Sequence, residues 1–115
     1  MNIIRHSPGK LMSAAVEYGN LVFVSGTIPD NPDAGIREQT ANILSKIDAV
    51  LAAAGTNKSN VLSASIWVTD IRNREAMNEA WLAWIDPANP PARATVQATL
   101  ADPRWLVEIS VTAAK

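Results

Sequence analysis

An arginine and a glutamate near the end of the chain are of the residue types that carboxylate chemistry requires. Arg93 follows the pair Pro90-Pro91 and opens a segment, residues 93–100, in which apolar and polar residues alternate as in a β-strand. A proline pair fits the beginning of a strand and would disrupt its middle. A permanent cation with forked N–H donors at this place is suited to hold a carboxylate or a phosphate. An arginine at a strand end that reaches water or a structural partner is the more common alternative.

Glu108 lies on the polar side of the next alternating segment, residues 105–113. A carboxylate there can form an ion pair with a cation, or accept a proton and position water as a general base. Residues 101–104 predict a hairpin, which would place Gln97 opposite Glu108 and Arg93 about 13 Å further along its strand. We therefore expect both side chains to face a shared ligand in a cleft between subunits; a structural ion pair is the alternative.

Fewer chemical signals are present elsewhere in the chain. Ser25, Gly26 and Thr27 end an apolar run, where Gly26 would let a ligand approach the backbone and the amides would donate to an anion. Many strands end in Ser-Gly, so this signal is weak. Trp67 shares the polar side of its strand with serines, which makes it a candidate for an interface or a pocket wall. His6 is the only histidine, and we expect no catalytic role for it.

Length and composition predict a single globular domain covering residues 1–115. Apolar residues make 48% of the chain and charged residues 18%, which argues against disorder. A net charge of −1 without a basic stripe gives no reason to expect nucleic acid as a partner. No cysteine is available for a disulfide, and no His-rich set predicts a metal site. The chain has no apolar run typical of a signal peptide or a membrane span, so a cytoplasmic protein without a membrane partner is expected.

The periodicity of apolar residues predicts the elements that position these side chains. We expect, in chain order, a short strand at 16–18, a strand at 21–26, a helix at 37–54, a strand at 61–69, a helix capped by Asp70 or Asn73 and ending near Ile85, and strands at 93–100 and 105–113. A further short strand could precede them. Two one-sided helices on a mixed β-sheet define an α+β fold, a two-layer sandwich with both helices on one face.

The sheet face away from the helices is predicted to carry short polar side chains. Alternation assigns to it Ser63, Ser65, Thr69, Thr95, Gln97, Thr99, Ser110 and Thr112, with Ala94, Val96, Ala98 and Leu100 on the core side. A freely solvated face would usually carry Lys and Glu as well. We therefore expect an oligomer that packs through this face; a plain solvated face is the alternative.

Three blocks of sequence, in the same order along the chain, resemble the YjgF/RidA family of reactive-intermediate (enamine/imine) deaminases. The blocks are Gly19–Pro29 (GNLVFVSGTIP); Val68-Thr69-Asp70 with Asn78-Glu79-Ala80-Trp81; and Pro91-Ala92-Arg93 with Leu106-Val107-Glu108-Ile109. The third block is the most specific, because an arginine after Pro-Ala is followed one predicted hairpin later by an apolar-Glu-Ile triplet. The resemblance extends over nearly the whole chain.

The resemblance implies a chorismate-mutase-like subunit that assembles as a homotrimer, with three sites in clefts between subunits. It also implies an enzyme without a cofactor, which adds water to the imine carbon of a small 2-imino acid and releases ammonia and a 2-keto acid. The alternative is a non-catalytic module that binds a carboxylate metabolite in the same clefts. Some relatives carry endoribonuclease activity, which the net charge of −1 disfavours here.

By resemblance, Arg93 matches the arginine that holds the substrate carboxylate, and Glu108 the glutamate that orients the attacking water. Ser25 and Gly26 match the loop at the site. Chemistry agrees with these roles, since a bidentate arginine–carboxylate pair would leave the imine carbon near a water that a glutamate can polarise.

Three further positions complete the implied site, and one of them departs from the family pattern. Thr95 stands where many members carry cysteine, and Asn78 matches a recurrent helix asparagine. Where many active members have Pro-Tyr-Ser, this chain has Leu11-Met12-Ser13, so a thioether replaces the tyrosine hydroxyl. Met12 therefore indicates a divergent subgroup.

Overall fold

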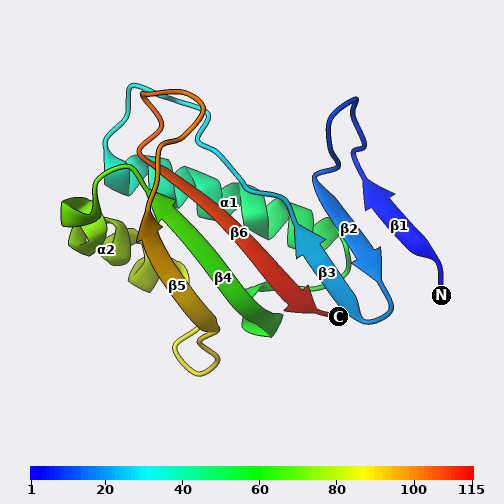
Figure 1. Ribbon diagram of the computed structural model, residues 1–115. Helices are drawn as coiled ribbons and strands as arrows, with labels where there is room; N and C mark the ends of the chain where they lie inside the picture. Colours follow the sequence, from blue (N-terminus) through cyan, green and yellow to red (C-terminus); the bar gives the residue numbers. More distant parts are fainter.

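A computed structural model describes residues 1–115 and shows a six-stranded mixed sheet with both long helices on one face (Figure 1). This confirms the predicted α+β two-layer sandwich. The elements are β1 (Ile3–His6), β2 (Ala15–Tyr18), β3 (Leu21–Val24), α1 (Ile36–Ala53), η1 (Lys58–Asn60), β4 (Val61–Val68), η2 (Ile71–Asn73), α2 (Arg74–Trp84), β5 (Ala92–Gln97) and β6 (Val107–Ala114). Neither helix is long and apolar enough to cross a membrane.

The order of the strands corrects one sequence prediction. The sheet runs β1-β2-β3-β6-β4-β5, so β4 lies between β5 and β6. The expected hairpin through residues 101–104 is therefore wrong. β5 pairs with β4 in parallel, and β6 pairs antiparallel with both β4 and β3. The segment between β5 and β6 passes over the end of β4 (Figure 1).

The core lies between the sheet and α1, as the helical spacing of its apolar residues predicts. Ile43, Leu44, Ile47 and Leu51 are almost completely buried, and they meet the inward residues of β3, β4 and β6. The helix ends before Gly55, whose φ of +80° suits a residue without a side chain. Burial of this stripe is what fixes α1 across the sheet.

Helix α2 lies beside α1 and nearer the β5 edge (Figure 1). The Asp70 side chain accepts a hydrogen bond from the Arg72 amide and caps the short turn η2, from which α2 continues. The predicted stripe of Met77, Trp81 and Trp84 is buried. The helix ends at Trp84, just before Ile85 and the Asp86-Pro87 pair.

A buried carboxylate joins the N-terminal strands to the end of β6. Glu17 of β2 is 5% exposed, and its oxygens accept hydrogen bonds from His6 Nε2 at 2.5 Å and from Lys115 Nζ at 2.6 Å. These hydrogen bonds, with the two nearby charges, hold the pKa of Glu17 below its ordinary value. His6 thus has a structural partner in Glu17.

Candidate functional site

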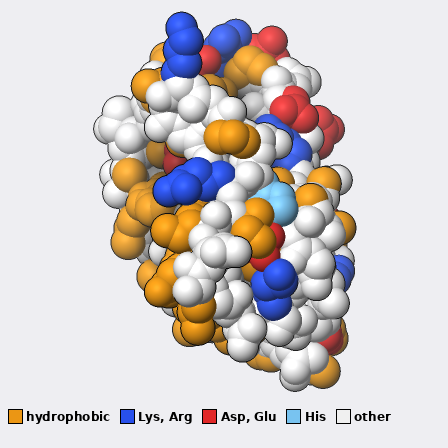
Figure 2. All heavy atoms as spheres, turned by 90° about the vertical axis from the view of Figure 1, so that its right-hand side faces the viewer, with side chains coloured by type: hydrophobic (Ala, Val, Ile, Leu, Met, Phe, Trp, Pro, Cys, Tyr) orange, Lys and Arg blue, Asp and Glu red, His pale blue; other side chains and the backbone are white.

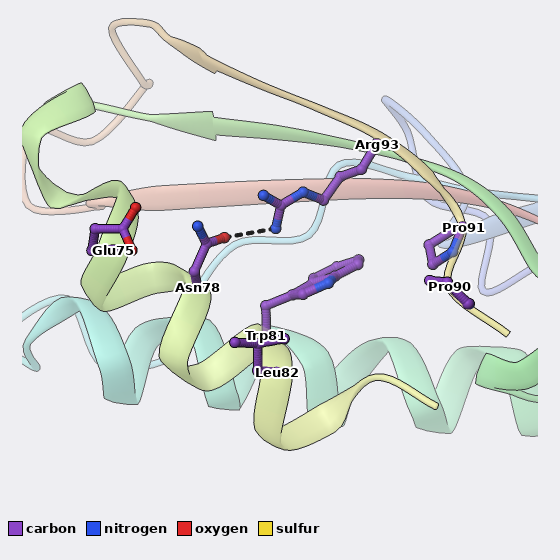
Figure 3. Close-up of a pocket in the computed structure, with 7 residues that line it drawn as sticks. All are labelled: Glu75, Asn78, Trp81, Leu82, Pro90, Pro91 and Arg93. Atoms are coloured by element: carbon purple, nitrogen blue, oxygen red, sulfur yellow. Dashed lines mark hydrogen bonds between the residues drawn. The ribbon is translucent and has the colours of Figure 1, made fainter. Parts of the chain in front are cut away.

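Arg93 lies in an open pocket of about 380 Å³ between α2 and the beginning of β5 (Figure 3). The prolines place the chain at the sheet edge just before the arginine, and α2 forms the pocket floor. The lining residues are Glu75, Asn78, Trp81, Leu82, Pro90, Pro91 and Arg93. The pocket therefore combines one cation, one amide and the Glu75 carboxylate with apolar walls.

The Arg93 guanidinium makes contact with uncharged groups only. Its Nη1 donates to Asn78 Oδ1 at 2.7 Å, and its Cζ lies 5.3 Å from the centre of the Trp81 ring. No carboxylate forms an ion pair with it, although Arg37, Arg72 and Arg74 each have one and Arg104 has two. Partial burial, and then repulsion from Arg74, lower the pKa of Arg93 from its ordinary value. The cation is held in place while its charge stays uncompensated.

The β5 register corrects the predicted faces of that strand. Arg93 pairs with Ala64 and Thr95 with Ile66, so both side chains project from the helix-covered face. Ala94 and Val96 project from the uncovered face, which is the reverse of the prediction. The Thr95 hydroxyl is buried on the covered side and has no hydrogen-bond partner. A buried hydroxyl without a protein partner is uncommon.

A second pocket, of about 330 Å³, lies near the end of β3. It brings together the predicted residues Met12, Ser25 and Gly26, and the Ser25 hydroxyl donates to the carbonyl of Ser13. Glu108 borders the same segment, because a side chain at Gly26 would collide with the Glu108 carboxylate. Gly26 is thus required by close approach of this carboxylate to the backbone.

The predicted site residues fall into two groups that one chain does not bring together. Arg93 and Asn78 share the first pocket, whereas Met12, Ser25 and Gly26 share the second, with Glu108 at its border. Glu108 pairs with Trp67 and faces away from the helices, opposite to Arg93. The register and strand spacing separate the two Cα atoms by about 14 Å. A ligand held by both residues would need a second chain.

The uncovered sheet face has two parts. Ser63, Ser65, Ser110 and Thr112 lie on it over β4 and β6, as predicted, whereas Thr95 and Gln97 do not. Over β1, β2 and β3 the face is largely apolar, with Arg5 as a charged member; its exposed apolar members include Ile3, Tyr18, Leu21 and Phe23. In Figure 2, which looks from the β1 side, hydrophobic side chains gather along the left. This combination of small polar and exposed apolar side chains is suited to close packing against another surface.

Sequence reasoning did not identify Trp81 as part of the pocket, because its place in the apolar stripe of α2 explains it as a core residue. The sequence feature that could have identified Trp81 as a pocket residue is its spacing from Asn78. Residues three apart on a helix lie on neighbouring parts of one face, so a helix that presents Asn78 to Arg93 also presents Trp81. The apolar wall of Leu82, Pro90 and Pro91 likewise follows only from the tertiary structure.

Comparison with known proteins agrees with this fold. The family model described as Endoribonuclease L-PSP matches residues 5–115. The RutC family protein YoaB of Escherichia coli is 44% identical over 114 residues, with 99% of each chain covered. A RutC family protein of Haemophilus influenzae is 41% identical over 114 residues, with 98% of each covered.

Solved structures of similar proteins have the same fold. A member of the YjgF protein family from Neisseria meningitidis superposes with a TM-score of 0.97 at 42% identity, covering 100% of this chain and 96% of that one. These observations define the class of protein: an α+β subunit with two helices on one face of a mixed sheet. The chain belongs to the YjgF/RutC family, as the sequence resemblance predicted.

Proposed function

We propose that this protein hydrolyses small 2-imino acids to 2-oxo acids and ammonia, in clefts between the subunits of a homotrimer. The observation that carries the proposal is the Arg93 guanidinium, which lies in an open pocket without an acidic partner. A guanidinium in this state offers a carboxylate two parallel charge-assisted hydrogen bonds. The proposed ligand therefore carries a carboxylate next to its reacting carbon.

In the proposed reaction, Arg93 fixes the carboxylate and Glu108 orients the attacking water. Glu108 accepts a proton as the water oxygen bonds to the imine carbon, and returns this proton to the nitrogen. The hydroxyl proton of this adduct then passes to the nitrogen through Glu108, the C–N bond breaks, and ammonia leaves as the C=O bond forms. Because the imine carbon is already reactive toward water, positioning and modest proton transfer suffice.

The second subunit is proposed because Arg93 and Glu108 project from opposite faces of one sheet. The Met12–Gly26 pocket of one copy, with its Glu108, would meet the Arg93 pocket of the next. Thr95 and Asn78 would accompany Arg93, and the uncovered sheet face would form the subunit contacts. An assembly of this kind repeats the same heterologous contact and closes as a ring.

Complementation between two inactive variants tests both parts of the proposal. Imines generated in solution from amino acids by an oxidase are the substrates, and ammonia release above the buffer rate is measured. Arg93→Ala and Glu108→Gln are each expected to be inactive. When they are co-assembled in equal amounts, about a quarter of the clefts should regain both residues, and activity with them. Failure of mixed assemblies to regain activity, with exchange of chains verified, would contradict the composite site.

Met12 favours a second candidate, a non-catalytic module that binds a carboxylate metabolite in the same cleft. A thioether donates no proton, so the replacement of the family tyrosine removes one group that assists hydrolysis. This candidate predicts measurable binding of 2-oxo acids with no acceleration of imine hydrolysis. The description of the family model also requires an RNA test: salt-sensitive RNA binding would support an endoribonuclease, which the net charge of −1 disfavours.

A further inference from the structure

Building on the proposed role of Arg93 as carboxylate anchor, we propose that Trp81 is the positioning residue that holds the Arg93 guanidinium ready for its ligand. Trp81 acts through Arg93 and needs no contact with the reacting atoms. The indole and the Asn78 amide together form a clamp without charge.

The geometry of the clamp restricts the arginine from two directions. Asn78 Oδ1 occupies one donor of the guanidinium, Nη1, at 2.7 Å. The Trp81 ring lies under the group, with its centre 5.3 Å from Cζ. Figure 3 shows both side chains rising from α2 toward Arg93. An arginine on an edge strand is otherwise free to turn into solvent, so these contacts reduce the side-chain entropy that ligand binding would have to remove.

The clamp is uncharged, and for this reason it leaves the Arg93 charge available to a ligand. A carboxylate partner would hold the guanidinium equally well but would compete with the carboxylate of a ligand. An amide oxygen and an aromatic face attract the cation more weakly and leave its net charge in place. Partial desolvation and the neighbouring Arg74 further raise the energy of the unoccupied cation. The negative charge of a bound anion offsets both costs.

Trp81 itself is well placed to act as a rigid platform. It is 6% exposed and packs against Trp84, with ring centres 5.3 Å apart at an angle of 54°. The ring under Arg93 is therefore held by its burial in the helix layer and does not depend on the ligand. Trp84 is anchored separately, by a hydrogen bond from its Nε1 to Asp48 at 3.0 Å.

Trp84 supplies the matched control for a test of this role. It is an equally large, buried tryptophan on the same helix and in contact with Trp81, and its cation partner is Lys58 instead of Arg93. Substitution of either tryptophan by leucine removes a similar volume from the core. Only Trp81→Leu removes the platform under the arginine.

The test measures binding of 2-oxobutanoate and of its amide, 2-oxobutanamide, by titration calorimetry, together with unfolding temperature. Trp81→Leu is expected to weaken binding of the acid by about 3- to 30-fold and to leave the amide unchanged. Trp81→Phe keeps an aromatic face and should restore most of the affinity. Trp84→Leu should lower the unfolding temperature at least as much while its affinity for the acid stays within about twofold of the wild type.

Turnover is recorded separately, so that this inference and the proposed reaction can fail independently. With an imino acid as substrate, Trp81→Leu should raise KM and leave kcat nearly unchanged. Absent turnover with a Trp81-dependent affinity for the acid would refute the deaminase and retain the clamp. The clamp is overturned if Trp81→Leu and Trp84→Leu weaken acid binding equally, if acid and amide lose affinity together, or if the wild type binds neither.

Discussion

Glu17 and Arg93 are both charged groups drawn partly out of water, yet their surroundings differ completely. Glu17 is buried at the N-terminal side of the sheet, between a histidine and a lysine that both contact its oxygens. Arg93 is held at the opposite edge by an amide and an indole ring, with no anion paired to it. The first charge is satisfied within the fold, so it contributes to stability. The second is positioned without being satisfied, which is what a binding group for an external anion requires.

The largest expected effect is that of Arg93→Ala, which removes the cation that has no anion partner. If Arg93 is the anchor, kcat/KM for a 2-imino acid should fall by about 100-fold or more, since a charge-assisted bidentate contact is lost. The unfolding temperature should change little, because the arginine satisfies no buried charge. Kinetic assays and thermal unfolding of the same preparation measure both. Loss of assembly with activity that merely follows it would make Arg93 structural.

Like Arg93, Glu108 has no ion-pair partner within the chain, so it is also free to act on a ligand in the proposed site. In Gly26→Ala, the added methyl group would collide with the Glu108 carboxylate and displace it. We expect kcat to fall by about 10-fold or more with KM less affected, because a misplaced general base slows the chemical step. Steady-state kinetics provide the measurement, with Gly35→Ala as control, since open space surrounds that glycine. Equal losses in the two variants would argue against a catalytic role for Glu108.

Glu17→Gln should give the converse of Arg93→Ala. The substitution keeps the shape of the side chain but removes the charge that His6 and Lys115 contact. We expect the unfolding temperature to fall by several degrees while kcat/KM at room temperature stays close to that of the wild type. Differential scanning calorimetry with a parallel activity assay separates the two. A large loss of activity in the still-folded variant would break the distinction between the two regions.

The smallest expected effect is that the difference in unfolding temperature between the wild type and Glu17→Gln depends on pH. Hydrogen bonds from Lys115 and His6 lower the pKa of Glu17 from its ordinary value of 4.5. A lowered folded-state pKa contributes stability above the ordinary value that is lost as the pH falls through the folded-state value. The unfolding temperatures of the wild type and Glu17→Gln should therefore converge in acid. A difference that persists unchanged below about pH 3 would show that the charge of Glu17 is not the cause.

Both helices and the strands could be predicted from the sequence, because each buried element has a strong local pattern. The stripe of Ile43, Ile47 and Leu51 predicts a helix wherever it packs, and the turn at Gly19-Asn20 predicts the hairpin of β2 and β3. The anion site at Arg93, inferred from its residue type, stays a prediction. These features depend on residues close together in the chain.

The errors concern β5, for a physical reason. As an edge strand with little burial on either face, β5 alternates between small and polar residues without a pattern that indicates which face is covered. Its partner could not be inferred from loop length either, because a short connection permits both a hairpin and a passage over one intervening strand. The placement of Arg93 on the helix side, beside Trp81, depends on that choice. It is a property of the tertiary structure alone.

The two pockets are also encoded in separate stretches of the chain. The Arg93 pocket comes entirely from residues 75–93, that is α2 and the beginning of β5, whereas the second comes from residues 7–50. Under the proposed function, substitutions that alter recognition of the ligand can therefore accumulate in one stretch while the other stays fixed. Exchanging residues 74–97 between relatives would move a whole recognition surface as one cassette, with β4 and α1 as the constant support.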